Sequence, residues 1–214
     1  MNRRTISLLL ALGLSILTVQ AQDFSPAMQQ VYKTCLQMRQ AFASGSQSGL
    51  GTANRQLKQL APSYFASCRI KRGDTVSLNG HYLFDCVFVD SLIANKQVYK
   101  KAQDYALRYA DERAESTEQV SLRNFALRKG GSLQLVFTGK GKTDIAVVAE
   151  PHAKVTLRVT DKDTGKSYTD AKQANRGMAS RTCSVPVPGN ETHTLYVEVI
   201  NCSRHDISFA LIKN

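Results

Sequence analysis

The chain has 214 residues, of which 43% are hydrophobic and 21% are charged, and this composition excludes an intrinsically disordered chain. Lys and Arg outnumber Asp and Glu by 28 to 17, so the formal net charge is +11. A charge of this sign favours anionic partners. The basic residues are scattered, however, and aromatic residues do not alternate with them, so we expect no nucleic-acid partner.

The first 21 residues have the three parts of an export signal. Asn2-Arg3-Arg4 is basic, Ile6–Val19 is almost wholly apolar, and Val19-Gln20-Ala21 fits the positions that a signal peptidase reads. The alternative is a membrane anchor, but the apolar run is shorter than the ~20 residues that span a bilayer. We therefore expect cleavage before Gln22, no membrane span, and a periplasmic, outer-membrane-associated or secreted protein.

The next part of the chain has helical periodicity. Apolar residues recur at spacings of three and four from Met28 to Phe42, after a Ser25-Pro26 start that suits a helix cap and first turn. The same spacing returns from Leu50 to Tyr64. A short polar connector between the two segments predicts that these helices fold back on each other as a hairpin. A third helix is predicted at residues 96–115.

A small β-hairpin is predicted between the second and third helices. Asn79-Gly80 separates Thr75–Leu78 from the apolar run Tyr82–Val89, and Asn-Gly between apolar runs is a strong hairpin signal. The second run is too continuously apolar for a half-exposed strand. We therefore expect it to pack beneath the helices.

From Val120 onward the apolar residues alternate with polar ones, which predicts β-strands. Glycine-containing breaks separate these strands at the spacing of a β-sandwich. The continuous apolar run Ile145–Val148 predicts a more deeply buried strand. The predicted fold class is α+β, with a signal peptide at 1–21, an α-rich N-terminal domain at 22–118 and a jelly-roll-like antiparallel β-sandwich at 119–214.

The last two predicted strands have matching apolar faces. The inward sets are Leu195, Val197 and Val199 in one strand, and Ile207, Phe209 and Leu211 in the other. Pairing Val199 with Ile207 places the two sets opposite each other throughout. The pattern therefore predicts a terminal antiparallel hairpin with Cys202 at its tip.

Five cysteines and an exported chain favour disulfide bonds. If the Val-Pro-Val-Pro segment after Cys183 formed a regular ladder strand, Cys183 would lie roughly 16 Å from Cys202, against the ~5.5 Å between the Cα atoms of a disulfide. The predicted Cys183–Cys202 bond therefore requires this segment to leave the ladder. Cys68–Cys86 is the second predicted bond, and Cys35 is the odd thiol, buried on the apolar face of its helix.

Few groups of residues have the spacing of a chemical site. Asp161-Lys162-Asp163-Thr164-Gly165 alternates carboxylates as a calcium loop does, but it lacks a third acidic residue in step and contains a lysine. We expect a hairpin turn there, and no metal or cofactor in the chain. Arg69, Lys71 and Arg72 form the candidate anion-binding cluster.

The sequence between residues 120 and 214 resembles the bacterial pre-peptidase C-terminal domain. The resemblance is carried by Asp144–Val148, the Thr160–Gly165 turn, Tyr196–Val199 and Ile207–Leu211. It implies a β-sandwich that accompanies secreted enzymes and serves in adhesion or substrate binding. Thr194 stands where that family has a glycine, and the acidic metal-binding positions of the family are mostly absent, so the resemblance does not imply calcium binding.

These patterns predict a non-catalytic binding or accessory protein of the Gram-negative cell envelope. Its expected partner is an anionic polysaccharide or another envelope protein. One alternative is a secreted hydrolase with a site at His81, Asp85 and Asp90, although on a strand Asp90 is out of phase with the other two. The other alternative is a folding helper or inhibitor of a co-exported protein.

Overall fold

The computed structural model describes residues 24–64, 69–76, 82–94, 120–168, 179–188 and 191–214. The predicted signal peptide and the predicted helix at 96–115 lie outside these ranges. The described elements are α2 (Pro26–Ala43), α3 (Gln47–Leu60), β1 (Ser63–Tyr64), β2 (Arg69–Gly73), α4 (Cys86–Ala94), β3 (Ser121–Leu127), β4 (Ser132–Lys140), β5 (Lys142–Ala149), β6 (Val155–Asp161), β7 (Ser180–Pro186), β8 (Thr192–Asn201) and β9 (Ile207–Lys213).

The strands form two sheets that pack face to face. Sheet A has the order β1-β3-β9-β5-β7 and sheet B the order β2-β4-β8-β6. All described strand pairs are antiparallel except the two-residue pair of β1 with β3. Each described strand joins the sheet opposite to that of the strand before it, as in a jelly roll. The predicted α+β class with an antiparallel sandwich is confirmed.

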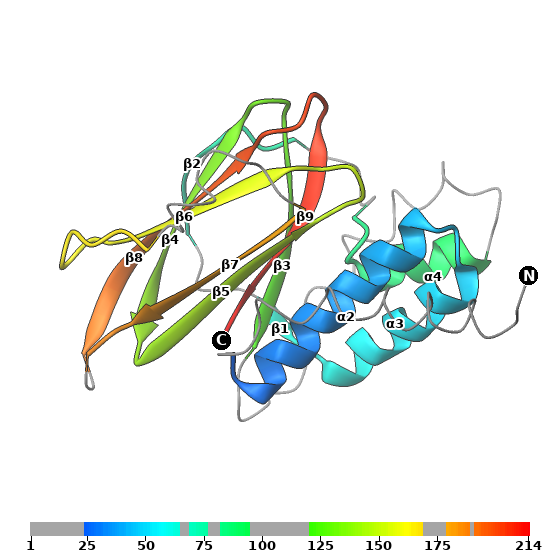
Figure 1. Cartoon of the computed structure of the whole chain (residues 1–214), viewed down its shortest axis with the longest axis horizontal. Coiled ribbons are helices and arrows are strands. Elements are labelled where there is room, and N and C mark those ends of the chain that lie inside the picture. The colour runs from blue at the N-terminus through cyan, green and yellow to red at the C-terminus, as the bar shows by residue number, and fades with distance from the viewer. Residues whose placement is uncertain (1–23, 65–68, 77–81, 95–119, 169–178, 189–190) are drawn as a thin grey trace, which may run out of the picture.

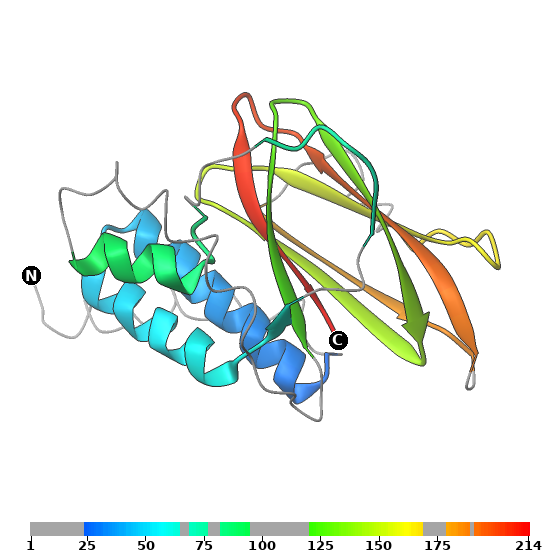
Figure 2. The same cartoon turned by 180° about the vertical axis from the view of Figure 1, so that it is seen from behind.

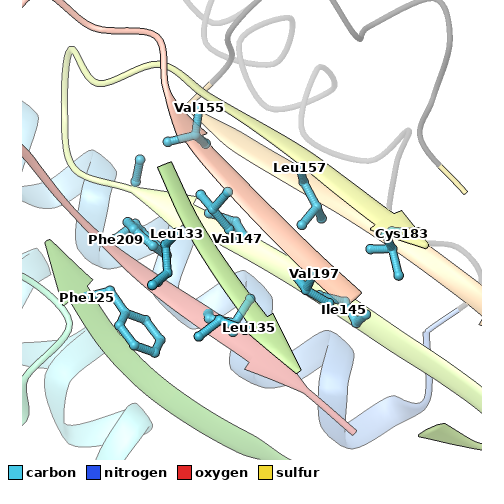
Figure 3. Close-up of a cluster of buried hydrophobic side chains, with 14 of the residues drawn as sticks. Phe125, Leu133, Leu135, Ile145, Val147, Val155, Leu157, Cys183, Val197 and Phe209 are labelled. Atoms are coloured by element: carbon cyan, nitrogen blue, oxygen red, sulfur yellow. The ribbon is translucent and has the colours of Figure 1, made fainter. Parts of the chain in front are cut away.

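Sheet A is the middle of three layers, between sheet B and the helices (Figures 1 and 2). One apolar core fills the space between the sheets (Figure 3), and a second lies between the helices and the outer face of sheet A. Strand β5 contributes to both, because Ile145 and Val147 face the first core while Ala146 and Val148 face the second. The predicted deep burial of this run is confirmed.

The predicted helical hairpin is also confirmed. Helix α2 begins at Pro26, where the Ser25 hydroxyl accepts a hydrogen bond from the amide of Met28 at 3.3 Å. Helix α3 is capped in the same way by Ser46, whose hydroxyl accepts from Gly49. Among the described helices, none is both long enough and apolar enough to span a membrane.

The predicted β-hairpin at 75–90 is wrong, because its second half is the helix α4. Asp85 precedes this helix and accepts hydrogen bonds from the amides of Val87 at 2.8 Å and Phe88 at 3.0 Å. A short continuous apolar run does not distinguish a strand from a buried helix, and the cap at Asp85 favours the helix. The Asn79-Gly80 turn lies outside the described residues.

The predicted pairing of the last two strands is wrong, but the prediction of which face of each strand is buried is confirmed. All six inward residues of β8 and β9 are buried as expected. The two strands nevertheless lie in opposite sheets, since β8 pairs with β4 and β6, and β9 pairs with β3 and β5. Strand alternation fixes which face is apolar but not which strand lies alongside, so two facing sheets satisfy the pattern as well as a hairpin.

Two strands come from the part of the chain assigned to the helical domain. Strand β1 adds to the edge of sheet A, and β2 adds to the edge of sheet B. Helix α4 follows β2 along the chain and packs against α3. Helical and sheet segments are therefore interleaved before residue 119.

The structure contradicts the predicted Cys183–Cys202 disulfide. The segment after Cys183 stays in the ladder, because Ile145 pairs with Cys183 and Lys142 pairs with Pro186. Proline is tolerated there since β7 is an edge strand. Cys183 points into the core (Figure 3), Cys202 is exposed between β8 and β9, and both thiols are free.

The other cysteines lie in the helical part of the chain. Cys35 is buried on α2, as expected, and burial together with the neighbouring Cys86 thiol raises its pKa. Cys68 lies outside the described residues, so the Cys68–Cys86 bond stays a prediction.

Candidate functional site

The outer face of sheet B presents polar and aromatic side chains. In β4, Gln134 and Val136 alternate with the buried Leu133 and Leu135, and the same alternation puts Tyr196 and Glu198 of β8 on the outer face. Tyr196 and Glu198 are half-buried, and Arg158 of β6 is exposed. These positions differ from the outer face of sheet A, which the helices cover.

Strand register arranges these side chains in two adjacent rows. The first row is Gln134, Glu198 and Arg158, and the second is Val136, Tyr196 and Thr160. In the first row the Glu198 carboxylate accepts a hydrogen bond from Gln134 Nε2 at 3.4 Å and lies 3.5 Å from Arg158 Nη1. Lys71 of β2 reaches the second row, where its ammonium lies 4.4 Å from the centre of the Tyr196 ring. We name Lys71, Gln134, Arg158, Tyr196 and Glu198 the sheet B surface.

The chemistry of the sheet B surface suits an anionic ligand with an apolar face. The tyrosine ring offers a flat apolar surface, and the lysine and arginine offer positive charge beside it. The Arg158 side chain is 52% exposed, and an exposed ion pair contributes only about 0–1 kcal/mol. A ligand carboxylate can therefore replace Glu198 at the guanidinium at little cost.

The predicted anion-binding residues lie on β2, at the edge of this sheet. Arg69 and Arg72 are register partners of Val136 and Gln134, and the register shifts between Ile70 and Arg72. Lys71 lies within this irregularity and reaches the Tyr196 ring. The structure thus brings Lys71 together with Tyr196, which the sequence analysis did not connect with it.

A second group of polar residues lies where β6 ends and β8 begins. Asp161 Oδ2 lies 2.6 Å from His193 Nδ1, and Glu191 Oε2 lies 3.1 Å from His193 Nε2. The side chains of Asp161 and His193 are only 1% and 8% exposed, whereas that of Glu191 is 71% exposed. We name Asp161, Glu191 and His193 the carboxylate–histidine cluster.

Hydrogen bonds determine the charge state of this cluster. The contact with Asp161, followed by that with Glu191, raises the pKa of His193 against the opposing effect of burial. Burial disfavours the charged form of Asp161, but hydrogen bonds from His193, from the Thr164 side chain and from two backbone amides outweigh it and lower the pKa of Asp161 to about 2. These contacts favour the imidazolium form of His193 more than the environment of a free histidine does.

The carboxylates of the 161–166 turn accept hydrogen bonds from backbone amides as well as lying near His193. Asp161, Asp163 and His193 offer ligand atoms within 4.8 Å of one another. Asp161 Oδ1 already accepts from the amides of Asp163 and Thr164, and Asp163 Oδ2 accepts from the amide of Thr194 at 2.6 Å. These contacts close the predicted hairpin turn, which is confirmed by the pairing of Thr160 with Ser167.

Asp85 and Asp90 of the alternative hydrolase site make separate contacts in the helical layer. Asp85 Oδ1 caps α4, while the Asp90 carboxylate accepts from Asn54 Nδ2 at 2.8 Å and pairs with Lys58. Each carboxylate thus has a structural role in the helical layer. His81 lies outside the described residues.

An open groove of about 280 Å³ lies among the described helices, at the connection between α2 and α3. Phe42 and Leu50 line one side, and Leu92 and Ile93 of α4 line the other. Among the described residues that line it, none has a titratable side chain.

No known protein family matches the sequence, and no curated protein is similar to it. The chain is similar in structure to a mitogen from Yersinia pseudotuberculosis, with 10% identity over 45% of this chain and 85% of that one, at a TM-score of 0.36. It is also similar to a xylan-binding domain from Paenibacillus barcinonensis, with 11% identity over 47% of this chain and 88% of that one, at a TM-score of 0.23. A GH115 4-O-methyl-α-glucuronidase matches 88% of this chain with 28% of its own length, at 12% identity and a TM-score of 0.27. At these TM-scores the similarities assign neither family nor ligand.

Proposed function

We propose that this chain is an exported, non-catalytic accessory protein of the bacterial envelope that binds an anionic glycan through the sheet B surface. The observation that carries the proposal is the Tyr196 ring, with Lys71 above it and Arg158 in the adjacent row. Because Lys71 lies over the Tyr196 ring, a sugar stacks on that face once this flexible side chain moves aside to pair with the ligand's carboxylate. A uronate carboxylate also pairs with the Arg158 guanidinium. The net charge of +11 adds long-range attraction for such a polymer.

Direct binding to polysaccharides tests this proposal. We expect the protein to bind a uronate polymer such as polygalacturonate in calorimetry, and to bind a neutral glucan of equal length more weakly. Arg158→Ala should weaken binding to the uronate polymer by up to about fivefold, because an ion pair at an exposed guanidinium contributes about 0–1 kcal/mol. Tyr196→Ala should weaken the binding of any sugar that stacks there, by about tenfold.

The matched control is Arg55→Ala, which removes the same charge from an exposed position on α3, in the layer farthest from sheet B. Its affinity should equal that of the wild type. Equal losses in Arg158→Ala and Arg55→Ala would show that only net charge matters. A glycan array without binding, together with recovery of an envelope protein in a pull-down, would contradict glycan recognition in favour of a protein partner.

Export stays a separate part of the proposal. The mature N-terminus, determined by mass spectrometry of the protein from the bacterial periplasm or medium, should be Gln22 if the predicted signal is cleaved. A mature chain that retains residues 1–21 would contradict this part without affecting the binding surface.

A further inference from the structure

The carboxylate–histidine cluster links two segments that are distant in the sequence. Asp161 is the last residue of β6, and His193 lies near the start of β8. His193 meets a carboxylate at each of its nitrogens, at 2.6 Å and 3.1 Å. A neutral imidazole has one N–H and can donate to only one of them, whereas the protonated ring donates to both. The geometry is therefore complete only when the ring carries its second proton.

The two segments meet through the backbone as well. The Lys162 amide donates to the Thr194 carbonyl at 2.9 Å, and the Thr194 amide donates to Asp163 Oδ2. His193 is only 8% exposed, so water competes weakly for its nitrogens. Loss of the ring proton leaves one carboxylate contact without a donor at this junction.

The charges around the ring are mainly negative. Asp161 lies at the end of β6, Asp163 in the turn that follows, and Glu191 directly before β8. On β4 the register partner of His193 is Gly139, and the adjacent Lys140 lies at an exposed position of the strand. On β5, Lys142 faces Asp144 at 3.9 Å, and on the turn Lys162 and Lys166 are exposed.

We propose that Glu191, His193 and Asp161 form a proton-operated clamp that fastens the 161–166 turn to the start of β8 in mildly acidic solution and releases it in alkaline solution. This inference does not depend on glycan binding. It assigns to His193 a positioning role, in which the state of its ring sets how tightly one end of sheet B is held.

The sign of the pH dependence follows from the two pKa shifts. The pKa of His193 is raised, so its stabilisation is fully present below the ordinary value of about 6.5 and is lost as pH rises through the raised value. The pKa of Asp161 is lowered to about 2, so its stabilisation is present above about 4 and is lost as pH falls through about 2. Both contributions are complete between about pH 4 and 6.5.

The experiment compares thermal unfolding of the full chain and of His193→Gln between pH 5 and 9.5. We expect the melting temperature of the wild type to exceed that of the variant, with a gap that shrinks by at least roughly 3 °C from pH 5.5 to pH 9.5. His152→Gln, which removes an exposed histidine outside the cluster at a left-handed backbone position, is the control, and its gap should not change with pH. A gap for His193→Gln that stays constant with pH would overturn the proposal.

Two measurements hold even if His193→Gln does not fold. In the wild type, NMR titration of the His193 ring should give a pKa above 6.5, and Glu191→Gln, which changes an exposed side chain, should lower it. Hydrogen exchange at the Thr194 amide should accelerate more steeply than base catalysis alone as His193 deprotonates. A pKa at or below 6.5 overturns the clamp. A dependence on metal also overturns the clamp. If replacing EDTA with Zn²⁺ or Ca²⁺ raises the melting temperature of the wild type but not that of His193→Gln, an ion rather than a proton holds the cluster.

Discussion

At the scale of single residues, Asp161 has two partners of different kinds. One carboxylate oxygen accepts from the amides of Asp163 and Thr164, and the other contacts His193. Asp161→Asn keeps the size of the side chain and an oxygen for the turn but removes the charge that faces the ring. We expect it to lower the free energy of unfolding at pH 6 by about 2 kcal/mol, within the range for hydrogen bonds to charged groups, as measured by urea denaturation.

The acid limb of the stability curve provides a second readout for Asp161. The wild type should lose stability as pH falls from about 4 toward 2, whereas Asp161→Asn should lose less over that interval. Asp163→Asn, at an exposed position in the same turn, should have a smaller effect at pH 6. Equal costs for the two variants would show that burial of Asp161 has no energetic consequence.

The accessibility of the two thiols gives a test of the finding that Cys183 and Cys202 are not bonded to each other. The thiol of Cys202 is exposed, whereas that of Cys183 is buried, and burial together with the charge of Asp144 raises the pKa of Cys183 to about 12. The thiolate is the reactive form, so iodoacetamide should label Cys202 in the native protein, and Cys183 and Cys35 only after denaturation. Mass spectrometry of tryptic peptides checks this. A linked Cys183–Cys202 peptide would contradict the structure.

The residues of the candidate sites could be predicted only in part. Lys71 was identified from its basic neighbours, but its contact with Tyr196 depends on β2 joining the same sheet as β8. The contact between Asp161 and His193 likewise depends on β6 lying beside β8. Both strand neighbours are distant in the sequence, and no local pattern specifies them.

At the scale of elements, the start of α4 depends on the cap at Asp85. Its carboxylate accepts from the second and third amides of the helix, and loss of an N-cap costs about 1 kcal/mol. We expect Asp85→Ala to lower the free energy of unfolding by at least that amount in urea denaturation. Asp85→Asn, which retains a capping oxygen, should keep most of the stability. Equal losses in both variants would mean that the charge of Asp85, and not its capping, is what matters.

Elements were predictable where local chemistry determines them. Ser25-Pro26 fixed the start of α2 to the residue, and alternation identified the buried faces of β8 and β9. Strand partners were not predictable in this way, because an inward apolar face is satisfied equally by a hairpin or by an opposing sheet. The prediction for Tyr82–Val89 was wrong for a related reason, since every residue of this run except Asp85 is apolar and the pattern has no clear period.

At the scale of the whole molecule, the helices and the sandwich share the outer core of sheet A. Ala146, Val148, Ala210 and Ile212 face the helices and are buried there. A fragment of residues 119–214 would expose this apolar strip and would also lack β1 and β2. We expect the fragment to self-associate in size-exclusion chromatography and to bind a hydrophobic dye, unlike the full chain. A monomeric fragment with cooperative unfolding would instead establish residues 119–214 as an independent domain.

The alternation of successive strands between the two sheets also constrains when each sheet can be completed as the chain is synthesised. Interior positions of the two sheets are held by β8 and β9, which come after all the other described strands in the sequence. Until they emerge, β4 and β6 have no strand between them, and neither do β3 and β5. Neither sheet can be completed before β8 and β9 have been synthesised, so completion of the sandwich depends on contacts of high sequence separation, which are slow to form.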